Sequence, residues 1–82
     1  MVNLVNIKKQ DNILTCNYYT ECNIEDQGYI EYDIIRHEIL NVEYSEADKI
    51  YNIAFGCGKA KRALERVIEN GNYPESYCYM WY

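Results

Sequence analysis

The stretches YIEYDII, residues 29–35, and EILNVEY, residues 38–44, decide the fold of this chain. In each stretch, apolar side chains alternate with acidic or amide side chains, which is typical of a β-strand with one buried face. The short gap between the two stretches favours an antiparallel hairpin. The side chains expected to face the core are Ile30, Tyr32, Ile34, Leu40, Val42 and Tyr44.

A second hairpin is predicted before this one, with strands near residues 3–8 and 12–19 joined by a polar turn. Residues 20–28 read as an acidic loop between the two hairpins. The aromatic C-terminal residues 77–82 would fray unless they dock. We therefore expect them to return as a fifth strand or to anchor a partner.

A helix is predicted to cover the open face that such a sheet would leave. Ser45 and Asp48 resemble a capping box that begins a helix at Glu46, and Asn70-Gly71 ends the following run of helically spaced apolar residues. Two nearby glycines cost about 2 kcal/mol relative to alanine inside a helix. An interruption is therefore expected near Gly56–Gly58.

These elements predict an α+β fold in a single domain over residues 1–82, with an antiparallel four- to five-stranded sheet covered by one helix. A chain of this size buries only about 60–65% of its unfolded surface, and an active site needs supporting residues as well as a core. A small binding module is therefore favoured over an enzyme. No apolar run approaches the ~20 residues of a membrane span and no signal peptide is evident, so we expect a cytoplasmic protein with no membrane partner.

The cysteines Cys16, Cys22, Cys57 and Cys78 are spaced more widely than the paired ligands of a zinc site. Because no secretory signal accompanies them, they are expected to be reduced, buried thiols that bind no metal. The single histidine, His37, falls where the turn of the second hairpin is predicted, so a solvated turn residue is favoured over a ligand or general base. No catalytic residue, metal site or cofactor is predicted.

Charge is distributed unevenly along the chain, whose formal net charge is −5. Nine acidic residues and one basic residue, Arg36, lie between Glu21 and Asp48, whereas the predicted helix carries a basic cluster at residues 59–66. Overall acidity argues against direct binding of nucleic acid, because phosphate contacts depend on lysine and arginine. Ordinary solvated sheet and helix faces are favoured as the account of this charge distribution, and a recognition surface made of the carboxylates is the alternative.

Ten tyrosines exceed what so small a core can absorb, and partly exposed tyrosine suits protein recognition. We therefore predict a non-catalytic interaction protein that binds a partner with a basic surface. A phage- or mobile-element-encoded inhibitor that occludes a host nucleic-acid-directed system would fit this chemistry. The candidate partner-binding residues are Glu25, Asp26, Tyr29, Glu31, Asp33, Glu43 and Trp81.

Two alternatives remain open at this stage. One is a small enzyme or ligand-binding protein with a pocket between helix and sheet near Cys16, Tyr51 and Cys57, which a closed apolar core would disfavour. The other is a homodimer formed through the aromatic tail and the sheet edges.

The segments VNIKK at residues 5–9, AKRAL at residues 60–64, Pro74 and the terminal Met80-Trp81-Tyr82 carry a resemblance. In these features the chain resembles a family of short uncharacterised bacterial proteins that end in Met-Trp-Tyr. The resemblance implies a compact α+β fold and transfers no catalytic residue. Gly56-Cys57-Gly58 departs from the family pattern and puts the local helix geometry in doubt.

Overall fold

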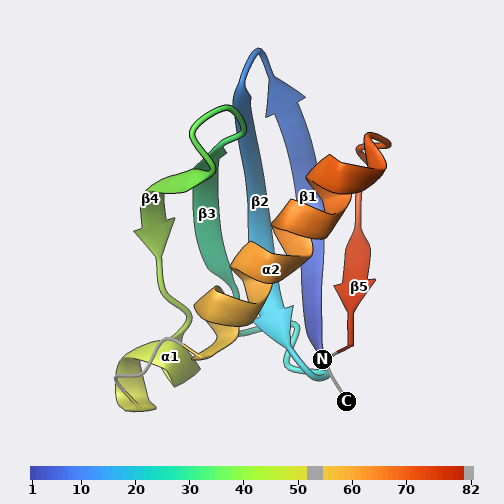
Figure 1. The fold of residues 1–82 in the computed structure, drawn as a ribbon. Helices are drawn as coiled ribbons and strands as arrows, with labels where there is room; N and C mark the ends of the chain where they lie inside the picture. The colour runs from blue at the N-terminus through green and yellow to red at the C-terminus, as the bar shows by residue number, and fades with distance from the viewer. Residues whose placement is uncertain (52–54, 81–82) are drawn as a thin grey trace.

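The computed structural model describes residues 1–51 and 55–80. In that part of the chain, four strands are followed by two helices and a last short strand (Figure 1). The elements are β1 (Val2–Gln10), β2 (Ile13–Thr20), β3 (Gly28–Asp33), β4 (Glu38–Glu43), α1 (Glu46–Tyr51), α2 (Phe55–Asn70) and β5 (Tyr77–Tyr79).

The strands form one antiparallel sheet in the order β4-β3-β2-β1-β5. Helix α2 crosses one face of this sheet and packs mainly over β1, β2 and β5 (Figure 1). The predicted α+β class, its two hairpins and its C-terminal fifth strand are confirmed. The opposite face of the sheet has no helix over it in the described part of the chain.

The core lies between α2 and the sheet because alternate residues of each strand point toward the helix. Ile30 and Tyr32 of β3 are fully buried there, as the alternation predicts, and Leu64 of α2 belongs to the same buried cluster. The buried apolar residues are Val2, Leu4, Ile7, Leu14, Cys16, Tyr18, Ile30, Tyr32, Cys57, Ala60, Ala63, Leu64 and Val67.

The expected alternation is wrong in the second strand of the later hairpin. Glu31 pairs with Asn41 but Tyr32 pairs with Ile39, so Leu40 is an extra residue that has no partner in β3. This β-bulge turns the side chain of Leu40 to solvent and places Ile39 on the core side in its stead. Tyr44, also expected inside, lies beyond the end of β4 and is exposed.

The helical region begins and ends where the sequence predicts. Ser45 caps α1, since its Oγ accepts a hydrogen bond from the Asp48 amide at 3.3 Å. The glycines Gly56 and Gly58 lie in the first turn of α2, where amides lack intrahelical partners in any case. Gly71 follows α2 with φ of 68°, and its amide bonds back to the carbonyl of Val67, which closes the helix.

The four cysteines are all free thiols, but the expectation that they are buried holds for only two. Cys16 and Cys57 lie in the core, whereas Cys22 and Cys78 are exposed. Cys22 lies in the loop after β2, and Cys78 points away from α2 because its cross-strand partner is Asn3. Among the described helices, none is long and apolar enough to cross a membrane.

Candidate protein-binding surface

The uncovered side of the sheet presents two adjacent cross-strand rows of polar and aromatic side chains. In the first row Glu31 of β3 lies between Thr15 and Asn41, and in the second Tyr29 lies between Asn17 and Glu43. Directly paired residues share a face, and the neighbours of these residues in β2 and β3 point into the core. We call this surface the acidic face: Thr15, Asn17, Tyr29, Glu31, Asn41 and Glu43.

Tyr29 is the centre of the acidic face, because a carboxylate stands on either side of it. Its hydroxyl donates to Glu31 Oε2 at 3.3 Å, and Glu43 is its cross-strand partner. Desolvation and the charges of Glu31 and Glu43 raise the pKa of Tyr29 above its ordinary value. The phenol therefore stays neutral at physiological pH and continues to donate its proton to Glu31.

The acidic face carries uncompensated charge. Within residues 1–51 and 55–80, neither Glu31 nor Glu43 forms an ion pair. The nearest basic residue in the strand register is Lys8, which pairs with Thr15 and so lies two strands away from Glu31. A basic side chain of a partner could therefore form ion pairs with these two carboxylates.

Asp33 shares the face but has a structural task. Its Oδ1 accepts hydrogen bonds from the amides of Ile35 at 2.9 Å and Arg36 at 3.1 Å, which fixes the turn between β3 and β4. The same turn contains His37 with φ of 56°, so the prediction of a turn histidine is confirmed. Reversing the charge of Asp33 would therefore disturb the hairpin as well as the surface.

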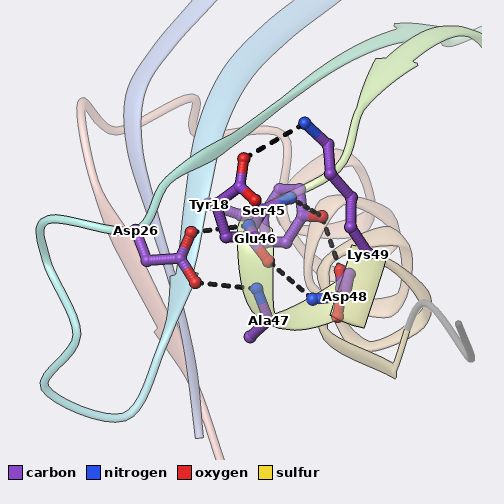
Figure 2. A network of polar contacts seen from close by, with 7 residues as sticks. All are labelled: Tyr18, Asp26, Ser45, Glu46, Ala47, Asp48 and Lys49. Carbon is purple, nitrogen blue, oxygen red and sulfur yellow. Dashed lines mark hydrogen bonds and ion pairs between the residues drawn. The ribbon is translucent and has the colours of Figure 1, made fainter. Parts of the chain in front are cut away.

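Asp26 is likewise occupied within the fold. Its two carboxylate oxygens accept hydrogen bonds from the amides of Glu46 at 2.6 Å and Ala47 at 3.0 Å, at the start of α1 (Figure 2). A negative charge at this position also compensates the positive end of the helix dipole. The neighbouring Glu25 is exposed in the same loop, outside the strands that carry Tyr29, Glu31 and Glu43.

A buried polar network next to this cap was not foreseen in the sequence. Tyr18 donates to Asp48 Oδ2 at 2.6 Å and accepts a bond from the Ser45 amide at 3.2 Å (Figure 2). The same Asp48 oxygen accepts a bond from the Cys57 amide at 3.0 Å in the first turn of α2. One carboxylate thus links β2, α1 and α2. In a capping box the carboxylate of Asp48 would accept a hydrogen bond from the Ser45 amide, but here that amide bonds to Tyr18 and Asp48 accepts bonds from Tyr18 and Cys57.

Of the three residues around which a helix–sheet pocket was predicted, Cys16 and Cys57 lie in the core, and the side chain of Tyr51 lies outside what the structure describes. Cys16 and Cys57 are both buried, and desolvation raises the pKa of Cys16 to about 12 and that of Cys57 above its ordinary value. Neutral thiols are poor nucleophiles and poor metal ligands. The chemistry of these two residues therefore disfavours catalysis there.

The structure brings Tyr29, Glu31 and Glu43 together and assigns Asp26 and Asp33 to structural bonds. Trp81, the remaining candidate, lies outside the described residues, as does the rest of the predicted tail anchor after Met80. Comparison of the chain with protein-family models, curated proteins and solved structures gives no match. The likeness to proteins ending in Met-Trp-Tyr therefore stays a prediction.

Proposed function

We propose that this chain is a non-catalytic protein-interaction module whose acidic face binds a basic surface of another protein. The observation that carries the proposal is the position of Tyr29 between Glu31 and Glu43, neither of which has an ion-pair partner in the described structure. An arginine or lysine side chain can stack on a tyrosine ring while carboxylates at the rim bind its charged end.

The composition of the acidic face supports recognition over catalysis. Tyrosine offers a large contact area with few rotatable bonds, and the surrounding threonine and asparagine side chains tolerate both water and hydrogen bonds to a partner. Uncompensated carboxylates steer a basic partner toward the face and set its orientation. A groove that binds the phosphates of a nucleic acid is one such basic surface. By occupying that groove, the chain would inhibit a nucleic-acid-directed protein.

The proposal is tested by reversing charge at the acidic face alone. A double variant with Glu31→Lys and Glu43→Lys should bind a synthetic arginine-rich peptide at least about tenfold more weakly than the wild type, measured by titration calorimetry. Wild-type binding should also weaken as salt is raised, since exposed charges are screened.

The matched control places the same charge change elsewhere. Glu69→Lys with Glu75→Lys, at two exposed positions of α2 and the following loop, alters net charge equally and should leave peptide binding within about twofold of the wild type. Equal losses in the two double variants would reduce the effect to net charge and contradict a specific acidic face.

A further inference from the structure

In the described part of the chain, the β4 edge of the sheet is only partly covered. Because α2 packs mainly over β1, β2 and β5, the helix-side rim at β4 is only half covered, and Ile39 and Val42 remain partly buried there (Figure 1). Leu40 in the bulge is 49% exposed, and Ile35 in the preceding turn is 67% exposed. Apolar side chains gathered at one edge mark a contact site more often than scattered ones do.

The outer edge of β4 also has backbone groups without a strand beside them. Strand β4 ends the sheet and pairs only with β3 among the described strands. A bulge often protects such an edge, but here it is confined to Leu40 and leaves Asn41–Glu43 in regular register with β3. An edge of this kind accepts an added strand through main-chain hydrogen bonds.

The two sides of this edge are complementary to different kinds of side chain in an added strand. Glu38 and Glu43 lie on the open side, because their partners Asp33 and Tyr29 do, and Val42 lies on the helix side. Residues paired directly across two strands share a face. A strand that matches β4 therefore alternates basic residues, opposite the glutamates, with apolar residues, opposite the half-covered rim.

A second copy of the chain fits this edge poorly. Antiparallel pairing of two β4 strands about their centre sets Glu38 opposite Glu43, and parallel pairing sets each glutamate opposite its own copy. Like charges directly opposite one another destabilise a strand pair. Charge thus selects a partner with basic residues over self-association through this edge.

We propose that the basic partner binds by adding an extended segment of alternating basic and apolar residues to the edge of β4. This inference rests on the proposed function, since the basic side chains of that segment would reach the acidic face. It adds the mode of binding and the sequence pattern of the partner.

The test compares two synthetic peptides of identical composition, one alternating arginine and valine and one with all arginines before all valines. The alternating peptide should bind about tenfold more tightly than the block peptide. Amide hydrogen exchange measured by NMR should slow at residues 38–43 when it binds. Methylating alternate backbone nitrogens of the peptide should abolish both effects, because it removes the main-chain donors.

A variant with Val42→Thr separates the two sides of the edge, because it makes the helix-side rim more polar and leaves the glutamates in place. The variant should bind the alternating peptide more weakly than the wild type does and bind the block peptide with unchanged affinity. If the variant does not fold, hydrogen exchange of the wild type still tests strand addition. Equal binding of the two peptides without protection at β4 would overturn strand addition while the acidic face stands. Binding of neither peptide would overturn both proposals.

Discussion

At the scale of single residues, two buried tyrosines of the same sheet face have opposite hydrogen-bonding situations. The hydroxyl of Tyr18 bonds to Asp48 and to the Ser45 amide, whereas the buried hydroxyl of Tyr32 has no hydrogen-bond partner in the described structure. Both rings fill the core equally well. The pair therefore isolates the value of the network from the value of packing.

We expect Tyr18→Phe to lower the free energy of unfolding by about 1–3 kcal/mol, because a buried carboxylate loses a donor and a buried amide loses its acceptor. Tyr32→Phe should leave stability unchanged or raise it slightly, since it removes an unsatisfied group without changing shape. Urea unfolding of both variants at neutral pH measures the difference. Equal losses would mean that the hydrogen bonds of the Tyr18 hydroxyl contribute nothing to stability.

The fold requires glycine at position 28, because the structure has no room for a side chain there. A Cβ at this position would collide with the ring of Tyr18, its cross-strand partner, and lie 2.7 Å from the carbonyl oxygen of Glu43. The hydroxyl of this same Tyr18 ring bonds to Asp48 and to the Ser45 amide. Any side chain here would therefore disturb the network as well as the strand.

At the scale of elements, the acidic loop after β2 has a structural role through Asp26. Asp26→Ala should destabilise the protein by about 1 kcal/mol, because two amides at the start of α1 lose their acceptor. The stability of Asp26→Asn should lie between those of the wild type and Asp26→Ala, since asparagine keeps one acceptor oxygen but lacks the negative charge that interacts favourably with the helix dipole.

The adjacent Glu25 supplies the control for this loop. Its side chain is exposed, so Glu25→Ala should change stability by less than about 0.5 kcal/mol. Thermal unfolding followed by circular dichroism compares the three variants directly. An Asp26→Ala protein as stable as Glu25→Ala would show that the cap seen in Figure 2 does not hold α1.

Local patterns predicted the elements well because alternation and caps are local signals. The hairpins, the Ser45 cap and the Gly71 stop all follow from residues close together in the chain. The bulge at Leu40 could not be read in this way, since it depends on how β4 pairs with β3. A strict period of two therefore placed Leu40 inside when the structure turns it outward.

The candidate site was predicted in part for the same reason. Tyr29, Glu31 and Glu43 share a face through strand register, which alternation anticipates. Asp26 and Asp48 bind amides far away in sequence, and a list of acidic residues cannot distinguish such carboxylates from free ones. Asx-type bonding of Asp33 to the amides of Ile35 and Arg36 was a local signal, and turn chemistry could have identified it.

At the scale of the whole molecule, one core layer supports one covered sheet face, so groups buried in that layer control global stability. Cys16 lies there, and desolvation raises its pKa from 9.0 to about 12 in the folded protein. The unfolded chain releases this proton near its ordinary pKa while the folded chain retains it. The contribution of Cys16 is therefore complete below about pH 9 and is lost as pH rises toward 12.

We accordingly expect the free energy of unfolding to fall above about pH 9, with a slope that approaches about 1.4 kcal/mol per pH unit for each such group. Cys57 and Tyr18, whose pKa values are also raised by burial, act in the same direction.

Urea unfolding from neutral to alkaline pH, under reducing conditions, should therefore show a shallower decline of the free energy of unfolding for Cys16→Ala than for the wild type. Cys22→Ala, which removes an exposed thiol, should keep the wild-type slope. Identical slopes in all three proteins would contradict a buried, neutral Cys16 in the folded protein.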